Sequence, residues 1–174
     1  MRGNWNNITL IGMPASGKST VGVLLAKRLG YRFIDSDLLI QEQEGCLLKD
    51  IIAARGLDGF LEVENRVNRN IEGGRAVIAP GGSVVYCREA MEHLSSIGTI
   101  VYLKLSYEEL AGRLSNLTDR GVALRPGMTL RDLYEERVPL YERYADITVD
   151  EAGRSSGAVV DILREMAEQA ISPR

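Results

Sequence analysis

Residues 12–20 read Gly12-Met13-Pro14-Ala15-Ser16-Gly17-Lys18-Ser19-Thr20. This stretch fits the pattern GxxxxGK[ST], in which a glycine-rich turn directs backbone N–H groups at phosphate oxygens. An apolar run at residues 8–11 precedes it, and a segment with apolar side chains at helical spacing follows it at residues 17–29. Since strand, spacing and helix agree, we interpret the stretch as a P-loop that opens an α/β fold, rather than as a chance glycine-rich turn.

The chemistry expected of this loop is nucleotide binding. Gly12 and Gly17 allow the backbone to curl around phosphate, and the N-terminus of the following helix adds its dipole. Lys18 carries positive charge for the β- and γ-phosphates of ATP, and the Ser19 hydroxyl is placed to bind Mg²⁺. The nucleotide-binding residues predicted in the loop are Gly12, Ala15, Ser16, Gly17, Lys18, Ser19 and Thr20.

Two carboxylates, Asp35 and Asp37, follow the second apolar run at residues 32–34. Ligands of open α/β sheets bind at the carboxyl ends of the strands, so both side chains should face the nucleotide site. Continued strand geometry would send both to the same side. We assign Asp35 to Mg²⁺, through a water molecule, and Asp37 to an acceptor hydroxyl that it orients. The alternative for Asp37 is a structural role as N-cap of the next helix.

The rest of the chain alternates short apolar runs with amphipathic segments of helical length, which is typical of a parallel sheet flanked by helices. The expected strands are residues 8–11, 32–34, 76–79, 99–103 and 147–149. The expected helices are residues 17–29, 37–44, 47–55, 57–71, 88–96, 107–116, 129–144 and 156–170. Ser106 and Thr129 are predicted N-caps. Residues 116–128 predict a mobile loop, and the whole chain, 1–174, predicts one domain.

The composition narrows the possible functions. A net charge of −3 argues against a general nucleic-acid binder, and no apolar run has membrane-spanning length. The first residues lack the apolar core of a signal peptide, so we expect a cytoplasmic protein. Cys46 and Cys87 are isolated and predict reduced, partly buried thiols. His93 is the only histidine, which argues against a His-ligated metal site, and we expect a monomer with a small-molecule hydroxyl acceptor.

Four further motifs follow the carboxylate pair in order. They are Gly59-Phe60 followed by Glu64, Pro80-Gly81-Gly82-Ser83, Arg113 with Arg120 seven residues on, and Arg137-Val138-Pro139-Leu140-Tyr141. Together with the P-loop and the aspartates, these motifs resemble those of the shikimate kinase family, and the likeness runs from about residue 7 to about residue 149.

The resemblance implies a P-loop NTPase fold with strand order 2-3-1-4-5 and a lid, about residues 116–128, that closes over ATP. It implies that Arg113 contacts adenine, that Arg120 is the lid arginine, and that the acceptor lies between Asp37, Gly81, Gly82 and Arg137. The implied activity is transfer of the γ-phosphoryl group of ATP to a hydroxyl of shikimate, a step of aromatic amino acid biosynthesis. Lys18, Asp37 and Arg120 are then the catalytic residues.

The residues by themselves support these roles in part. Arg120 stands beside Gly121 and is suited to swing onto a transferring phosphate, although most loop arginines are simply solvated. Gly81 and Gly82 would let backbone N–H groups approach a ligand, although an ordinary strand-to-helix turn has the same sequence. The Arg137 fork can take a carboxylate, but an ion pair with Glu135 or Glu136 is the competing role.

The sequence departs from the family pattern near the acceptor. Leu61 stands where the family has an arginine that contacts the substrate carboxylate, Pro80 replaces the first of three glycines, and the lid sequence also differs. Loss of a charge-assisted partner costs on the order of 2–3 kcal/mol. Either Arg55 or Arg66 supplies the missing charge and shikimate remains the substrate, or the acceptor is a different polyol or hydroxy acid.

Two functions of other kinds use the same loop. A non-catalytic nucleotide-binding switch would let the acceptor residues drift, which Leu61 and Pro80 suit, but the retained Asp37, Glu64 and Arg137 count against it. A nucleoside monophosphate kinase usually has a larger base-binding insertion, and none is obvious in this chain. We therefore favour a small-molecule kinase.

Overall fold

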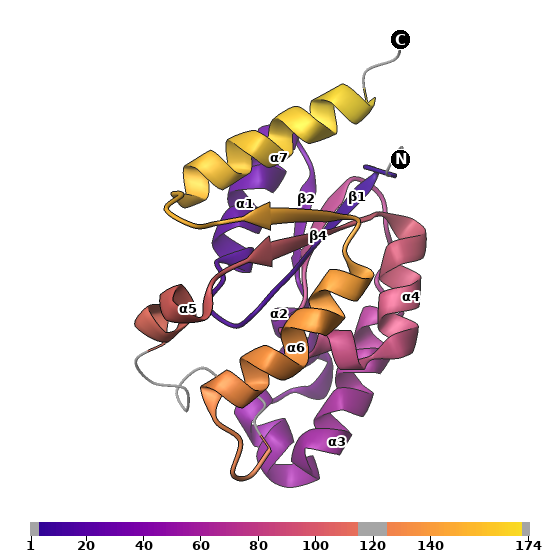
Figure 1. The fold of residues 1–174 in the computed structure, drawn as a ribbon. Helices are drawn as coiled ribbons and strands as arrows, with labels where there is room; N and C mark the ends of the chain where they lie inside the picture. Colours follow the sequence, from indigo (N-terminus) through magenta and orange to yellow (C-terminus); the bar gives the residue numbers. More distant parts are fainter. Residues whose placement is uncertain (1–3, 115–124, 172–174) are drawn as a thin grey trace.

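The computed structural model describes residues 4–114 and 125–171, and a five-stranded parallel sheet forms its centre (Figure 1). The strands are β1 (Asn7–Ile11), β2 (Arg32–Asp35), β3 (Ala76–Ala79), β4 (Thr99–Lys104) and β5 (Ile147–Asp150). They pair in the order β2-β3-β1-β4-β5, and each neighbouring pair is parallel. The α/β class, the strand order and all five predicted strands are thereby confirmed. The strand that leads into the P-loop, β1, is the central one.

Helices cover both faces of this sheet (Figure 1). They are α1 (Lys18–Leu29), α2 (Ser36–Glu44), α3 (Leu48–Asn68), α4 (Arg88–Ile97), α5 (Tyr107–Arg113), α6 (Leu130–Tyr144) and α7 (Ser156–Ile171), with a short 3₁₀ helix, η1 (Val84–Tyr86). On one face α1 and α7 pack side by side, whereas α4 and α6 lie on the other. None of the helices within the described ranges is both long and apolar enough to cross a membrane.

The strand sequences explain why the sheet is covered twice. Successive side chains of a strand point to opposite faces, so a strand buried on both faces is apolar throughout. In β4, Ile100 and Tyr102 belong to the core shared with α4 and α6, whereas Val101 and Leu103 belong to the core shared with α1 and α7. All four side chains are 0% exposed. This packing holds the carboxyl ends of the strands in fixed positions.

A third apolar cluster joins α2 and α3, with Ile40, Ile51 and Phe60 among its members. For residues 47–71 the sequence predicted two helices, separated at Gly56, and the structure confirms this break within α3. Gly56 adopts φ 69° and ψ −178° inside α3, which is the left-handed φ region that favours glycine. The second half of α3 carries Phe60 and Glu64 toward the sheet.

The structure confirms both predicted N-caps. Ser106 and Thr129 form capping boxes with Glu109 and Asp132, as predicted. The 3₁₀ helix η1 was not predicted. Both cysteines are free, but Cys46 is exposed rather than partly buried.

Most of the predicted lid, residues 116–128, lies outside the described residues. Arg120 is among the residues that are not described. The last residues of the lid form a turn in which the Met128 N–H donates to the Arg125 carbonyl at 3.1 Å.

Candidate active site

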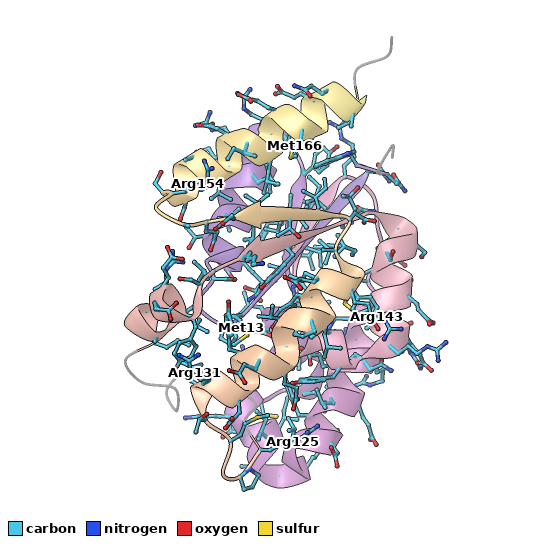
Figure 2. The ribbon with its side chains drawn as sticks, viewed as in Figure 1. Met13, Arg125, Arg131, Arg143, Arg154 and Met166 are labelled. Atoms are coloured by element: carbon cyan, nitrogen blue, oxygen red, sulfur yellow. The ribbon has the colours of Figure 1, made fainter. Side chains whose placement is uncertain are left out.

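The P-loop has the curled backbone that its glycines predict. Gly12, Ala15 and Gly17 all have positive φ, at 154°, 64° and 85°. The Lys18 ammonium donates to the carbonyls of Gly12 and Met13, both at 2.9 Å, so the side chain folds back over its own loop. Figure 2 labels Met13, which lies between the strand ends and α6. Burial lowers the pKa of Lys18 to about 8, because it disfavours the charged ammonium, and a bound anion would oppose this shift.

Asp35, and not Asp37, caps the helix after β2. Its Oδ1 accepts hydrogen bonds from the N–H groups of Asp37 and Leu38, at 3.0 and 3.3 Å. Its Oδ2 accepts one from the Ser19 hydroxyl at 3.3 Å. The alternative role of Asp37 as N-cap is therefore wrong. The argument from strand alternation fails as well, because α2 begins at Ser36 and places Asp37 in its first turn.

Asp37 faces a second carboxylate, Glu64 of α3, across Gly81. A Cβ atom on Gly81 would lie 2.7 Å from Glu64 Oε1 and 3.0 Å from Asp37 Oδ1, so this position has no room for a side chain. Both oxygens are buried and have no hydrogen-bond partner among the described residues. Burial, reinforced by Asp35, raises the pKa of Asp37 to about 6. These two oxygens are unsatisfied acceptors beside the P-loop.

Glu64 also holds the loop after β3. Its Oε2 accepts a hydrogen bond from the Ser83 hydroxyl at 2.6 Å, and the side chain is completely buried. Burial raises the pKa of Glu64 to about 7, although the Ser83 hydrogen bond opposes the shift. A buried carboxylate therefore connects α3 to residues 80–83, the glycine loop.

Arg137 reaches the site from α6 and is 1% exposed. Its Nε donates to the Tyr86 hydroxyl at 3.4 Å, and a Cβ atom on Gly82 would lie 3.1 Å from its Nη1. The Tyr141 hydroxyl donates to the Gly82 carbonyl at 2.6 Å. The helix and the glycine loop are thus locked together, with a guanidinium at their junction.

The two neighbouring glutamates on α6 contact other arginines, and Glu136 also accepts a hydrogen bond from the Tyr86 hydroxyl that Arg137 contacts. Glu135 pairs with Arg131 at 3.9 Å, and Glu136 pairs with Arg125 at 3.7 Å. Figure 2 shows Arg125 and Arg131 at the lower end of α6, in and just after the turn that precedes it.

One cavity of about 280 Å³ brings most of the predicted residues together. Its lining comprises Pro14, Ala15, Gly17, Lys18, Ser19, Thr20, Asp37, Leu48, Phe60, Ala79, Pro80, Gly81, Gly82, Ser83 and Arg137. Gly12, Ser16 and Asp35 are not part of this lining, although Asp35 accepts a hydrogen bond from Ser19, which is. The predicted nucleotide and acceptor residues thus meet at the carboxyl edge of the sheet.

Arg113, at the end of α5, contacts the P-loop but does not line the cavity. Its Nη1 donates to the Ala15 carbonyl at 3.3 Å and is 3.6 Å from Glu151 Oε2. Glu151 directly follows β5 and is 4% exposed, and burial raises its pKa to about 7. The sequence predicted Arg113 at the nucleotide but did not identify Glu151.

Neither arginine proposed to replace the one missing at Leu61 reaches the cavity. Arg55 and Arg66 both form ion pairs with Glu44, and about half of each side chain is exposed. Within the described ranges, Arg137 is the one arginine that lines the cavity. Leu61 packs against the apolar clusters on both sides of α3.

Several contributors were missed for identifiable reasons. Ser83 and Tyr86 follow the glycine pair, and the unpredicted helix η1 turns them toward Glu64 and Arg137. Phe60 and Glu64 were recognised as a motif but given no role, although their spacing of four residues predicts one common helix face. Glu151 stands at the carboxyl end of a strand, which was the available signal for it.

A phosphate-binding loop that opens onto a buried carboxylate and a buried guanidinium can hold a donor phosphate beside an anionic, hydroxylated acceptor. This arrangement places the protein among the P-loop phosphotransferases. Comparison with known sequences is more specific, because the family model for shikimate kinase matches residues 14–169. The chain belongs to the shikimate kinase family.

Individual relatives agree. The chain is 36% identical over 161 residues to the shikimate kinase of Thiobacillus denitrificans, which covers 91% of this chain and 88% of that protein. The solved structure of shikimate kinase from Acinetobacter baumannii in complex with shikimate has a TM-score of 0.82 at 29% identity and covers 97% of this chain and 96% of that one. Shikimate kinase from Aquifex aeolicus has a TM-score of 0.78 at 32% identity, with 96% and 99% covered.

Proposed function

We propose that the protein transfers the γ-phosphoryl group of ATP to a hydroxyl of shikimate. The observation that carries this proposal is the shared cavity, where the P-loop residues Lys18 and Ser19 face Asp37, Gly81 and Arg137. A nucleotide-binding switch has no need of an acceptor chamber with unsatisfied carboxylate oxygens, so the cavity favours a kinase.

The residues divide the work of the transfer. Lys18 leaves its own loop carbonyls and binds the phosphates, where its charge stabilises the spread negative charge of a loose transition state. Asp37, ionised above about pH 6, accepts a hydrogen bond from the attacking hydroxyl and orients it. Arg137 binds the acceptor carboxylate. The new bond joins the acceptor oxygen to the γ-phosphorus as the bond from that phosphorus to the β,γ-bridging oxygen breaks; ADP leaves with that electron pair, and the hydroxyl proton passes to Asp37.

A magnesium ion fits the residues beside the γ-phosphate position. Ser19 Oγ and Asp35 Oδ2 are neighbours at 3.3 Å, and Mg²⁺ commonly binds few protein oxygens together with phosphates and waters. Ser19 would hold the ion directly and Asp35 through water. When bound, the ion would neutralise charge on the phosphates.

Two further roles belong to the proposal. Arg113 would contact adenine, and its place beside the Ala15 carbonyl supports that role. Arg120 would close onto the phosphates with the lid, so that water is excluded and ATP is not lost to hydrolysis.

The direct test measures ADP release with a coupled assay. The acceptors are shikimate, quinate, gluconate, inositols and nucleoside monophosphates, and one reaction contains no acceptor. We expect turnover with shikimate well above the acceptor-free rate. Slow turnover that is independent of every acceptor would instead support the switch.

A different hydroxylated acid is the second candidate, and it is favoured because Arg137 is the one arginine of the described residues that lines the cavity. With Arg55 and Arg66 held by Glu44, an acceptor that needs two guanidinium groups would bind weakly here. Activity with another acid of the panel and none with shikimate would support this candidate and leave the kinase proposal intact.

A further inference from the structure

The order of the strands indicates on which side of the P-loop the nucleoside lies. In phosphoryl transfer, the attacking and leaving oxygens stand on opposite sides of the phosphorus. The P-loop follows the central strand β1, and the acceptor residues Asp37 and Gly81 follow β2 and β3 on one side of it. The leaving nucleotide must therefore extend to the other side, over the carboxyl ends of β4 and β5.

Arg113 and Glu151 are the charged pair on that side. Arg113 ends α5, which follows β4, and Glu151 directly follows β5. Figure 1 shows both strands running toward α5, and Figure 2 places Arg154 in the segment between β5 and α7. The Arg113 side chain is 40% exposed, whereas that of Glu151 is 5% exposed. The exposed member of the pair can meet a ligand, and the buried member cannot.

The contacts of Glu151 show what a buried carboxylate does in this place. Its Oε2 is 3.6 Å from Arg113 Nη1 and has no hydrogen-bond partner among the residues that the structure describes. A Cβ atom on Gly17 would lie 3.9 Å from its Oε1, so the carboxylate also lies close to the phosphate loop. An anion so near bound phosphates opposes nucleotide binding unless a cation compensates it.

We propose that Glu151 is a positioning residue for ATP, which holds the Arg113 guanidinium against the Ala15 carbonyl and on the path of the nucleoside. This rests on the proposed function, because that function places ATP in the P-loop. Arg113 then serves the nucleotide in two ways, as a contact and as the counter-charge of Glu151. Glu151 acts on affinity for ATP and not on the acceptor.

Removal of Glu151 and removal of Arg113 should weaken ATP binding to different extents. Glu151→Ala frees Arg113 and should weaken ATP binding about five- to tenfold, as loss of a half-exposed ion pair does. Glu151→Gln keeps an oxygen for the guanidinium and should weaken binding less. Arg113→Ala should be the most harmful, because it leaves a buried carboxylate unpaired beside the phosphates. Adding Glu151→Ala to Arg113→Ala should therefore restore part of the lost affinity.

The experiment measures ATP dissociation constants by calorimetry, together with kcat and the KM values for ATP and acceptor. The variants are the three single mutants and the double mutant, and Glu92→Ala removes a surface ion pair of α4 as the matched control. We expect Glu151→Ala to raise the dissociation constant and KM of ATP, with kcat and acceptor KM within about twofold of wild type. If Glu151→Ala does not fold, Glu151→Gln carries the same comparison.

Two results would overturn the inference. One is an ATP dissociation constant for folded Glu151 variants within twofold of the wild-type value. The other is a double mutant whose loss is the product of the two single losses, because independent residues behave in that way. Failure of the proposed function is distinct, since a wild-type protein that phosphorylates no acceptor can still be titrated with ATP.

Discussion

The donor side of the active site is made of backbone, whereas the acceptor side is made of buried side chains. Around the P-loop, positive φ at Gly12, Ala15 and Gly17 shapes the phosphate cradle, and one lysine supplies the charge. Opposite it, Asp37 and Glu64 converge on Gly81 from two different helices. A site of backbone tolerates little change in its sequence motif, but a site of side chains can alter its specificity residue by residue.

On the acceptor side, two carboxylates carry an unfavourable burial next to the place of the acceptor. The pKa values of Asp37 and Glu64 are raised to about 6 and about 7, chiefly by burial, and each group has an oxygen without a partner among the described residues. A hydroxylated ligand that donates hydrogen bonds would satisfy such oxygens. The P-loop thus meets its ligand with backbone N–H groups and Lys18, whereas the acceptor side presents unsatisfied oxygens that its ligand would complete.

The largest effect should come from Lys18→Ala, on the donor side. Loss of the one lysine in the cradle should lower kcat at least about 10³-fold, because the charge on the transferring group loses its main protein partner. The thermal midpoint should change little, since Lys18 bonds only to carbonyls of its own loop. Coupled ADP release and a melting curve measure both.

Lys27→Ala is the matched control, because Lys27 is an exposed lysine of the same helix. It should turn over like the wild type. Near-normal turnover of Lys18→Ala would remove the donor assignment.

Gly81→Ala should damage the acceptor side alone. The added methyl group must displace Glu64 Oε1 or Asp37 Oδ1, so kcat/KM for the acceptor should fall about 10²-fold while ATP binding stays near normal. Steady-state kinetics with each substrate varied in turn separates the two.

Gly157→Ala serves as the control, since its new methyl group would meet no atom closer than 3.8 Å. An equal loss of ATP affinity in Gly81→Ala would show that the two sides are not independent.

Glu64→Gln should reveal the cost of the acceptor side in stability. The pKa of Glu64 is raised above its ordinary value of 4.5 to about 7, so between these values the folded state binds more protons than the unfolded state. Stability is then lost as pH rises through this range. The wild-type free energy of unfolding should fall between pH 5 and pH 8 by about 2 kcal/mol more than that of Glu64→Gln.

Urea unfolding at both pH values measures this difference. Glu62→Gln changes an exposed glutamate of the same helix and should follow the wild type. Parallel curves for wild type and Glu64→Gln would mean that Glu64 is not held neutral by burial.

The sequence predicted the elements of the fold and the P-loop better than it predicted the contacts that build the acceptor side. Strand periodicity, the GxxxxGK[ST] spacing, the break at Gly56 and both capping boxes are local signals, and the structure confirms them. The acceptor side depends on contacts between distant elements. Asp35 took the capping role considered for Asp37, and Glu44, 11 residues from Arg55 in sequence, took both candidate arginines. No local pattern contains such competition.

Leu61→Arg should give the smallest effect and tests how far the acceptor side has diverged. A new guanidinium near the cavity could add on the order of 2–3 kcal/mol to the binding of a carboxylate. Much of this is offset because Leu61 packs against two apolar clusters, and an arginine there must extend past them. We expect the KM for shikimate to fall by less than about tenfold, with kcat unchanged.

Leu38→Arg adds the same charge at a side chain that is 63% exposed, and it should leave that KM unaltered. If both variants lower KM equally, the gain is long-range attraction of an anion; if neither does, the acceptor carboxylate lies away from Leu61 and Arg137 alone sets its position.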